Sequence, residues 1–384
     1  MTQNKPTILY LNIDENLGGS TQSLLDLIRS IKEQVNPIVL VPRQGLAYDT
    51  FIKEEIECYA YPFIKLYALQ ENRITDVLRY PWRWHAIKKL RFDYGCLKFV
   101  KKILNGRKID IVHSNTSPND VGVLLAKSLK AKHVWHVREF CDLDFHFEIY
   151  KGIPRLKDLI NKADARIAIS TAIAKHWQLK KDSTWVINNA ICSKNDVIYI
   201  PQKEKYILFT SYNLTETKGT RIAINAFAKS GVYHDGYVLK LMGNCMKEYR
   251  QSLQMTIDKN KINDFVEFVP CQIDVKPFFM HATAYIMASE CEGLGRVTAE
   301  AMFYGCPVIA RATGGTLDLV KDGYTGHLFK DIDECADLMK NVCSQNNEQL
   351  ILQAQEFVIN NLSREVYGPK IMEVYESILN ENIS

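Results

Sequence analysis

Residues 289–315 read SECEGLGRVTAEAMFYGCPVIARATGG, and they carry the clearest structural pattern of the chain. An apolar pattern with helical spacing follows the Gly-Leu-Gly-Arg run and stops at Gly305 and Pro307, as is typical of a helix end. Residues 308–310 then have the composition of a short buried strand. We therefore predict a loop, a helix, a strand and a second glycine turn, which is a unit of an α/β sheet.

Two carboxylates flank the start of this predicted helix. Glu292 and Glu300 are separated by seven residues, and Gly293 and Gly295 lie between them. Glycine lets a ligand approach the backbone closely, and the first turn of a helix has unpaired N–H groups and the positive end of the dipole. The stretch therefore predicts an anion, such as a phosphate, at the helix start with one carboxylate on each side.

Length and composition limit the class of protein. A chain of 384 residues exceeds one ordinary core, so two domains are expected. The apolar fraction of 47% and the charged fraction of 24% are those of a globular protein, and a net charge of +4 points to no class of partner. The ten cysteines include no Cys-x-x-Cys pair, which favours buried reduced thiols over a zinc site. We expect no secretory signal and no transmembrane helix.

The first half of the chain begins with a strand, a glycine loop and a helix. Residues 7–13 are a continuous β-prone run, the loop contains Gly18 and Gly19, and residues 23–31 carry apolar side chains at helical spacing. This is the opening of a βαβ unit, in which ligands bind beyond the carboxyl ends of the strands. The two glycines either place N–H groups near a phosphate or a sugar, or form a plain strand-to-helix turn.

Further short strands repeat along the chain with helices between them. A polar break at residues 201–205 places the domain boundary at about 195–205, and the second half restarts the same rhythm. The sequence thus predicts two open, mostly parallel sheets. The further strands are predicted at 37–41, 56–61, 110–115, 132–139, 165–170, 185–189, 206–210, 237–242, 265–269 and 284–288.

Three side chains lie near predicted strand ends. His136 and Arg138 close the strand at 132–139 and either reach a ligand or serve the structure. Lys218 lies where the loop after 206–210 meets a helix, so it either adds a point charge to a phosphate or is a solvated surface lysine.

Residues 73–108 are strongly basic. Eleven lysines and arginines stand against Asp76 and Asp93, with tryptophans, tyrosines and phenylalanines between them. A basic segment with such aromatics suits an anionic membrane surface. A solvated helix pair with aromatics in the core fits equally, whereas nucleic-acid binding is disfavoured because no nucleic-acid motif accompanies the charges.

With these motifs in register, the chain resembles the retaining glycosyltransferases of family 4, of the bacterial surface-polysaccharide type. Glu292 and Glu300 match the E-x7-E motif of that family. The resemblance implies the GT-B fold, with two doubly wound Rossmann-like domains that face across a cleft. The other matching positions are Gly18-Gly19, His136, 164–170, Lys218-Gly219, Ser289, Gly293-Leu294-Gly295, Ala301-Met302, Gly305, Pro307-Val308-Ile309-Ala310 and Gly314-Gly315.

The resemblance also implies roles for these residues. Glu300 would bind the ribose of a UDP- or GDP-sugar, and Glu292 would contact hydroxyls of the donor sugar. Lys218 and the amides of residues 293–295 would hold the diphosphate, Gly19 would add an amide, and His136 would lie near the reacting sugar. The expected catalytic residues are His136, Lys218 and Glu292. The expected donor-binding residues are Gly18, Gly19, Asn213, Lys218, Gly243, Pro270, Glu292, Gly293, Leu294, Gly295, Arg296 and Glu300.

The chain departs from the family at the phosphate. The family often has an arginine where this chain has Asn213, and Arg296 or Arg138 is a possible replacement cation. Asp318 stands where a glutamate is common. The resemblance implies domains at 1–198 for the acceptor and 199–365 for the donor, and a helix at 366–384 that includes Tyr375 and packs back on the first domain.

The expected function is therefore a retaining, metal-independent hexosyltransferase with no cofactor. It would move a sugar from a nucleotide-diphosphate donor to a glycan or lipid-linked acceptor in polysaccharide biosynthesis. It would work in the cytoplasm, as a peripheral protein at the inner face of the plasma membrane if residues 73–108 bind lipid. The alternatives are an inactive GT-B partner or glycan-binding subunit, which the missing arginine favours, and a GT-B epimerase or phosphorylase.

Overall fold

The computed structural model describes residues 5–62, 67–69, 82–196 and 202–380. The chain forms two compact units. The first unit comprises residues up to Ala190 together with the segment from Arg364 onward, and the second comprises Ile191–Ser363. The sequence analysis placed the boundaries after residues 198 and 365, and residue 198 lies outside the described part of the chain.

The first unit is built on a parallel sheet in the order β3-β2-β1-β5-β6-β8-β9. A separate antiparallel pair is formed by β4 and β7. The strands are β1 (Thr7–Leu11), β2 (Asn36–Val41), β3 (Glu57–Ala60), β4 (Tyr67–Leu69), β5 (Ile111–Ser114), β6 (Lys132–Val137), β7 (Phe147–Ile149), β8 (Ala165–Ala168) and β9 (Thr184–Val186).

Helices cover both faces of this sheet because alternate residues of each strand point to opposite sides. Ile8 and Tyr10 of β1 pack with α1 and α15, whereas Leu9 and Leu11 pack with α4 and α5. The central strands β1, β5, β6 and β8 are therefore buried on both faces, which explains their mostly apolar composition. The helices are α1 (Gly19–Ile31), α2 (Leu46–Lys53), α4 (Trp82–Leu104), α5 (Val121–Leu129), α6 (Gly152–Ile160), α7 (Thr171–His176) and α15 (Arg364–Asn380).

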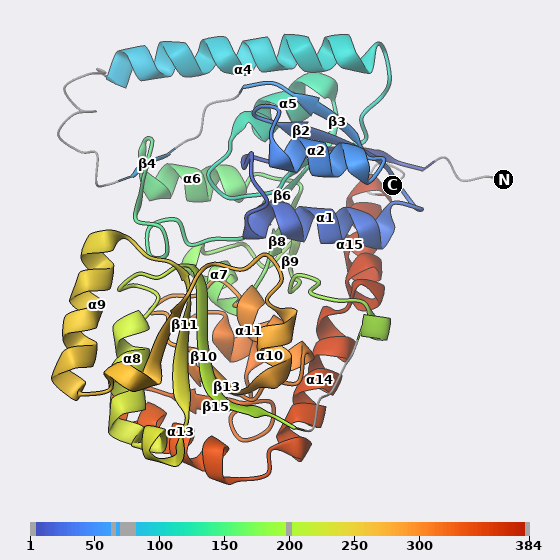
Figure 1. The fold of residues 1–384 in the computed structure, drawn as a ribbon. Helices are drawn as coiled ribbons and strands as arrows, with labels where there is room; N and C mark the ends of the chain where they lie inside the picture. Colours follow the sequence, from blue (N-terminus) through green and yellow to red (C-terminus); the bar gives the residue numbers. More distant parts are fainter. Residues whose placement is uncertain (1–4, 63–66, 70–81, 197–201, 381–384) are drawn as a thin grey trace. The chain divides into compact units, whose positions relative to one another are not determined.

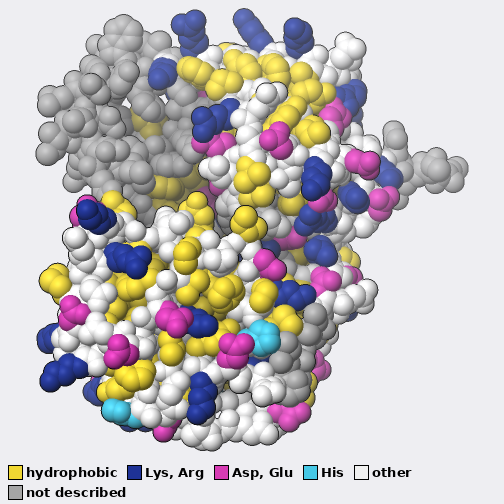
Figure 2. Space-filling view, in the orientation of Figure 1, with side chains coloured by type: hydrophobic (Ala, Val, Ile, Leu, Met, Phe, Trp, Pro, Cys, Tyr) yellow, Lys and Arg dark blue, Asp and Glu magenta, His cyan; other side chains and the backbone are white. Residues whose placement is uncertain are grey.

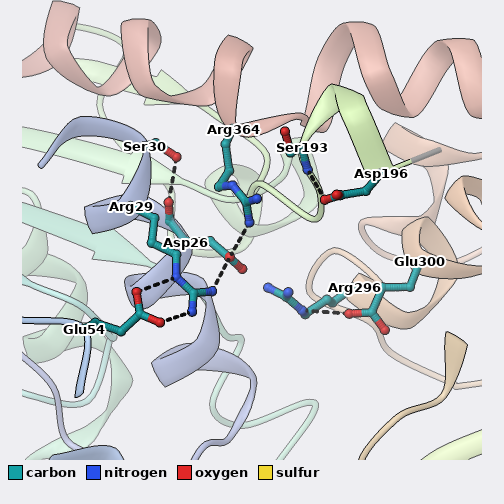
Figure 3. A network of polar contacts seen from close by, with 9 residues as sticks. All are labelled: Asp26, Arg29, Ser30, Glu54, Ser193, Asp196, Arg296, Glu300 and Arg364. Atoms are coloured by element: carbon teal, nitrogen blue, oxygen red, sulfur yellow. Dashed lines mark hydrogen bonds and ion pairs between the residues drawn. The ribbon is translucent and has the colours of Figure 1, made fainter. Parts of the chain in front are cut away.

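The last helix, α15, is part of the first unit and lies beside α1 (Figure 1). Its first residue, Arg364, lies 3.6 Å from the buried carboxylate of Asp26 in α1 (Figure 3). Gly368 allows the two helices to approach closely, because a Cβ at this position would lie 2.7 Å from the carbonyl oxygen of Ser30. Further along, Tyr367 and Tyr375 enter the core of the unit, so a segment distant in sequence completes it.

The second unit has a parallel sheet in the order β12-β11-β10-β13-β14-β15. Numbered within the unit, this order is 3-2-1-4-5-6, the order of a Rossmann fold, and the first unit follows the same rule. The strands are β10 (Glu204–Asn213), β11 (Val238–Asn244), β12 (Val266–Val269), β13 (Ala282–Met287), β14 (Val308–Arg311) and β15 (His327–Phe329).

The helices of the second unit lie on both faces of its sheet (Figure 1). α13 begins at the N-cap Asp331, whose carboxylate accepts hydrogen bonds from the backbone N–H groups of Asp333 and Glu334. The helices are α8 (Thr220–Ser230), α9 (Lys247–Asn260), α10 (Lys276–His281), α11 (Arg296–Phe303), α12 (Thr316–Leu319), α13 (Ile332–Ser344) and α14 (Glu348–Leu362), with 3₁₀ turns η2 (Lys194–Asp196), η3 (Val232–Asp235) and η4 (Asn263–Phe265).

The prediction of two Rossmann-like units with parallel sheets is confirmed. The stretch 289–315 forms a loop, the helix α11 and the strand β14, as predicted. Gly305 follows α11 with a φ of +73°, the conformation of a helix-ending glycine. The sequence analysis did not identify β15 or α13, which follow the second glycine turn.

Candidate functional site

The strand order reverses beside β10 and β13 in the second unit, because successive strands are added to opposite sides of β10. In open α/β sheets ligands bind beyond the carboxyl ends of the strands at such a switch point. The loop after β10 contains Lys218, and the loop after β13 contains Glu292. The two predicted residues therefore come from the strands that flank the switch point.

The loops at this point are tied together by hydrogen bonds. The N–H of Glu290 donates to the carbonyl oxygen of Thr217 at 2.9 Å, and the N–H of Gly315 donates to the carbonyl oxygen of Glu292 at 2.7 Å. A Cβ at Gly315 would collide with the carbonyl oxygen of Gly293. The second glycine turn therefore supports the backbone of the motif loop, and any larger residue at 315 would displace it.

Lys218 and Glu292 form an ion pair across the two loops. The Lys218 Nζ lies 3.2 Å from the Glu292 Oε2, and the two side chains are 38% and 21% exposed. Gly219, with a φ of +78°, follows the lysine at a point where a Cβ would collide with the carbonyl oxygen of Ala288. This close approach explains the Lys-Gly sequence, because glycine brings the lysine loop against the end of β13.

Arg296 and Glu300 form a second ion pair, on the first turns of α11. The Arg296 Nε donates to the Glu300 Oε1 at 2.9 Å, and both side chains are 20% exposed (Figure 3). Gly295 precedes the helix with a φ of +93°. Each carboxylate of the motif thus faces a cation in this structure, and all four charged groups remain partly open to solvent.

The other predicted donor-binding residues of the second unit lie at the carboxyl ends of β10, β11 and β12. Asn213 is the exposed last residue of β10, Gly243 is the next-to-last residue of β11, and Pro270 is exposed directly after β12. A Cβ at Gly243 would collide with the carbonyl oxygen of Ser211. These positions lie on the same edge of the sheet as Lys218, since parallel strands all end at one edge.

Gly18, Gly19 and His136 belong to the first unit. Gly18 is the N-cap of α1 and Gly19 its first residue, so both lie at a helix N-terminus at the end of β1. His136 lies within β6 and is fully buried. Burial, then Arg138 and His113, lower the pKa of His136 well below its usual range, so its ring is neutral.

Arg138 is held inside the first unit. Its Nε donates to both the backbone carbonyl and the side-chain oxygen of Asn115 at 3.0 Å, and its Nη1 donates to the Oδ1 of Asn189. Its Nη2 lies 3.2 Å from the Nδ1 of His136. All three guanidinium nitrogens have partners in this unit, which favours Arg296 over Arg138 as the replacement cation.

The sequence analysis did not single out His113 or Glu139 as candidate site residues. It also did not predict the contact between Tyr375 and His113. His113 lies on β5, beside β6, and its Nε2 is 3.3 Å from the Nδ1 of His136. Tyr375 of α15 places its hydroxyl 2.8 Å from the Nδ1 of His113. His136 was singled out by its place near the carboxyl end of a predicted strand, and His113 occupies the same kind of place, since it is the next-to-last residue of β5. No feature of the sequence around His113 predicts its contact with Tyr375 of α15.

Glu139 is a buried carboxyl group at the carboxyl end of β6. Its Oε1 accepts a hydrogen bond from the N–H of Ser117 at 2.9 Å. Burial and the nearby charge of Asp144 raise the pKa of Glu139 to about 8, although the Ser117 bond opposes this. The first unit therefore holds a carboxyl proton that an unfolded chain releases near pH 4.5.

This proton makes stability depend on pH. Between about pH 5 and pH 8 the folded chain binds a proton at Glu139 that the unfolded chain has lost, so the free energy of unfolding falls as pH rises, by up to about 1.4 kcal/mol per pH unit. We expect Glu139→Gln to remove this slope in urea unfolding at pH 5.5, 6.5 and 7.5. Glu33→Gln, at an exposed position of the same unit, is the control. Equal slopes for Glu139→Gln and wild type would contradict the assignment.

The basic segment 73–108 lies partly outside the described residues, since its side chains are described from Lys88 onward. From there to the end of α4, every exposed charged side chain is a cation. Figure 2 shows lysine and arginine side chains standing out over α4, with hydrophobic side chains beside them. Leu90 and Tyr94 are 57% and 55% exposed. The exposed cations of α4 are Lys88, Arg91, Lys98, Lys101 and Lys102.

Lys89 differs from the other lysines of α4. It is buried and forms ion pairs with Asp93, one turn along the helix, and with Asp120 at 2.7 Å. Asp93 is the only acid of α4, so the helix directs its single negative charge inward. The sequence interpretation counted Lys89 among the surface charges, which is wrong because this lysine is buried and pairs with the carboxylates of Asp93 and Asp120.

Within the described part of the chain, no cluster of three or more metal-ligating side chains is present. No described helix has the length and apolar character required to span a membrane. Six of the ten cysteines are buried, and burial raises the pKa of the Cys58 and Cys96 thiols to about 12, so these behave as core side chains.

Two family models match the chain one after the other. Residues 17–193 match the model described as Glycosyltransferase Family 4, and residues 194–357 match Glycosyl transferases group 1. Both models describe glycosyltransferases, and together they span residues 17–357. The chain belongs to the glycosyltransferases. The change from one model to the other falls three residues from the boundary between the two structural units, so each unit corresponds to one model.

Relatives of this glycosyltransferase include N-acetyl-alpha-D-glucosaminyl L-malate synthase of Bacillus anthracis, which is 24% identical over 83% of this chain and 84% of that protein. An uncharacterised glycosyltransferase of Methanocaldococcus jannaschii is 27% identical over 90% of this chain and 88% of that protein. A third, from Haemophilus influenzae, is 24% identical over 57% of this chain, and the match spans only 62% of that protein.

Among solved structures, HepE of Anabaena in complex with UDP and glucose has a TM-score of 0.78. It is 19% identical to this glycosyltransferase, and the match covers 97% of this chain and 100% of that one. Sucrose-phosphate synthase of Thermosynechococcus elongatus is also similar, with a TM-score of 0.74 and 15% identity over 98% of this chain and 100% of that one. These likenesses confirm the GT-B fold.

Proposed function

We propose that this glycosyltransferase is a retaining enzyme that moves a sugar from a UDP- or GDP-sugar to a glycan or lipid-linked acceptor in polysaccharide biosynthesis. The observation that carries the proposal is the pair of ion pairs at the switch point of the second unit, Lys218–Glu292 and Arg296–Glu300. Its likeness to HepE, whose structure holds UDP and glucose, supports a nucleotide-sugar donor.

The ion pairs suit a ligand that carries both phosphates and hydroxyl groups. A nucleoside diphosphate would draw Lys218 and Arg296 to its phosphate oxygens, because a phosphate is a stronger partner than a partly solvated carboxylate. Glu292 and Glu300 would then accept hydrogen bonds from the hydroxyls of the sugar and the ribose. Each carboxylate holds its partner cation in an ion pair, so both cations are in place before the donor arrives.

In the proposed step the bond between the anomeric carbon and the diphosphate oxygen breaks, a bond between that carbon and the acceptor hydroxyl oxygen forms on the same face of the sugar, and the proton of the hydroxyl passes to the leaving phosphate. Negative charge develops on the leaving phosphate, and Lys218, Arg296, the amides of residues 293–295 and the positive end of α11 would stabilise it. The stabilising charges come from the protein, so the proposed reaction is independent of a metal ion. Arg296 takes the place of the arginine that the family often has at the position of Asn213.

The first unit is proposed to bind the acceptor, and Gly18, Gly19 and His136 stay predicted contacts of the donor. Gly18 and Gly19 offer the N-terminus of α1 to a phosphate. His136 is a neutral ring at the end of β6. In the second unit, Gly243 and Pro270 are proposed to border the nucleotide at the ends of β11 and β12.

A thermal-shift panel with UDP, GDP and their sugars tests this function. A nucleotide at 100 times its dissociation constant adds about 2.7 kcal/mol to the stability of the unit that binds it. We expect one nucleotide series to raise the melting temperature and the matching sugar donor to be turned over. An inactive GT-B partner, which Asn213 favours, would give no turnover with any donor, and no shift with any nucleotide would overturn the proposal.

We also propose that the protein works at the cytoplasmic face of the plasma membrane and contacts anionic lipid through α4. The outer face of α4 carries five cations and exposed Leu90 and Tyr94, which suits the headgroup region. A surface cavity of about 390 Å³ lies beside the helix, and we propose that Arg91 and Lys98 in its lining bind the phosphate group of a lipid. Its lining residues are Tyr61, Arg91, Phe92, Tyr94, Gly95 and Lys98.

Replacing Lys88, Lys101 and Lys102 together by serine is expected to weaken binding to vesicles that contain phosphatidylglycerol. Each lysine near an anionic surface contributes about 1 kcal/mol, so the partition coefficient should fall roughly 100-fold. Co-sedimentation measures it. The control variant replaces Lys247, Lys259 and Lys370 by serine. These lysines are also exposed, so the control loses the same amount of charge. Absence of vesicle binding by the wild type, or equal loss in the control, would refute the membrane proposal.

A further inference from the structure

We propose that Arg311 is a further cation of the donor site and binds the phosphate that is bonded to the sugar. Neither the sequence motifs nor the two ion pairs at the switch point include this residue. The inference deepens the proposed function and rests on it for the identity of the ligand. Arg311 adds to Lys218 and Arg296 a positive charge that no carboxylate among the described residues neutralises.

The position of Arg311 in the sheet places it beside the loop of Lys218. Arg311 is the last residue of β14, which pairs with β13 next to the switch point. The register pairs the last residue of β13 with Ala310, so Arg311 stands at the carboxyl edge at the level of Ala288. The loop of Lys218 reaches the same level, because a Cβ at Gly219 would lie 2.1 Å from the carbonyl oxygen of Ala288. Arg311 and Lys218 therefore border the same end of β13.

The side chain of Arg311 leaves the sheet on the face that α8 covers. Alternate residues of a strand share a face, so Arg311 is on the same side as Ile309. Ile309 belongs to the core cluster that also contains Ala223 and Phe227 of α8. The loop of Lys218 leads directly into α8, so the Arg311 side chain lies on the face of the sheet that this loop also reaches.

The guanidinium group of Arg311 has no partner in the described part of the chain. It forms no hydrogen bond and no ion pair there, and its Nη1 is buried. The residue as a whole is partly exposed, so the side chain also reaches solvent, from which a ligand can approach. Lys218 and Arg296, by contrast, are each paired with a carboxylate. A buried N–H of a charged group without an acceptor is costly, which favours an anionic ligand as its partner.

A phosphate is the anion that suits this position. A guanidinium group presents several N–H donors in one plane, which match the oxygens of a phosphate. The two ion pairs of the site carry no net charge, so Arg311 supplies the excess positive charge that a diphosphate requires. A sugar hydroxyl is a weaker partner, because it brings no negative charge to the guanidinium.

The neighbours of Arg311 indicate which of the two phosphates it binds. Arg311 precedes the turn that ends at Gly315, whose N–H donates to the carbonyl oxygen of Glu292 at 2.7 Å. In the proposed function Glu292 contacts the sugar, and its partner Lys218 lies on the same side of the site. Arg296 belongs to the ribose side through its ion pair on α11. Arg311 therefore joins Lys218 at the phosphate next to the sugar.

The melting temperature of the ligand-free protein tests whether the guanidinium lacks a partner. Arg311→Met keeps a long apolar side chain and removes the charge. We expect it to raise the melting temperature by about 2 to 4 °C, because a buried N–H group without an acceptor is lost. Lys259→Met removes a charge from the exposed last turn of α9 and should change the melting temperature by less than about 1 °C. An unchanged or lower value for Arg311→Met would show that the fold itself satisfies the guanidinium, which would overturn the proposal.

Calorimetry with UDP and UMP, and with GDP and GMP, tests the phosphate contact. For the nucleotide series that binds, Arg311→Met should weaken the diphosphate by roughly 10- to 100-fold and the monophosphate by less than about threefold. Arg311→Lys keeps the charge and should bind the diphosphate within about fivefold of wild type. Equal losses for diphosphate and monophosphate, or a diphosphate affinity of Arg311→Met within about threefold of wild type, would overturn the proposal.

UDP-glucose and UDP-glucuronate separate the phosphate from an acid group on the sugar. We expect Arg311→Met to weaken both donors by the same factor as UDP. A loss confined to UDP-glucuronate would show that Arg311 binds the carboxylate of the sugar, and the phosphate assignment would be wrong. The proposed function fails if wild type binds no nucleotide at all, whereas nucleotide binding that Arg311→Met leaves unchanged refutes this inference alone.

Discussion

Lys218→Met is expected to lower kcat by about 100- to 1000-fold, the loss that follows removal of one pre-positioned group that stabilises developing negative charge. In the proposed reaction Lys218 binds the leaving phosphate more strongly in the transition state than in the ground state, so kcat should fall more than KM rises. The measurement is steady-state release of the nucleoside diphosphate from the donor that the thermal-shift panel identifies.

The structure supplies a matched control for this substitution. Lys229, at the end of α8 in the same unit, forms an exposed ion pair with Asp333, and Lys229→Met removes the same charge away from the switch point. We expect it to leave kcat within about twofold of wild type. If Lys218→Met also stays within about threefold, Lys218 is a solvated lysine that merely pairs with Glu292, and the proposed phosphate role is wrong.

Glu300→Ala is expected to weaken nucleotide binding by about 1.5 to 3 kcal/mol, or roughly 10- to 150-fold, because a carboxylate that accepts hydrogen bonds from ribose hydroxyls is lost. Isothermal calorimetry with the nucleoside diphosphate measures it. Glu356→Ala, an exposed glutamate on α14 of the same unit, is the control. Unchanged affinity in Glu300→Ala would refute the ribose contact.

Arg296 makes the Glu300 experiment more specific, because the two side chains are paired in the structure. If Glu300 contacts the ribose, Glu300→Ala should weaken the binding of the nucleoside monophosphate and of the diphosphate equally. Arg296→Met should instead weaken the binding of the diphosphate more than that of the monophosphate, since a cation that binds the phosphates is lost. If Glu300→Ala shows the pattern expected for Arg296, then Glu300 acts only by orienting the arginine.

Much of the second unit was predictable from sequence. The continuous apolar runs mark strands buried on both faces, and Gly314 and Gly315 mark places where only backbone fits, because a Cβ there would collide with the carbonyl oxygens of Glu292 and Gly293. Such signals are local. The pairing of Lys218 with Glu292 was not predictable, because it depends on the loop after β10 meeting the loop after β13. Strand order brings them together, and strand order is a property of the whole sheet.

One misreading and one omission have the same origin. Lys89 looks like its neighbours in composition, but its partner Asp120 precedes α5, distant in sequence. His136 was recognised at a strand end, whereas His113, which lies 3.3 Å from it, is on β5, and Tyr375, which contacts His113, is on α15. Local patterns gave the elements and the residues that carry charge. The partners of those residues come from other elements, and the structure was needed to identify them.

The position of α15 has a consequence for synthesis of the chain. The core of the first unit includes Tyr367, Ile371 and Tyr375, so this unit lacks part of its core until the ribosome has translated the whole second unit. The second unit is a continuous segment and can fold first, although it is made later. The nascent first unit would meanwhile leave the apolar face that α15 covers open to chaperones, which is a period of risk for aggregation.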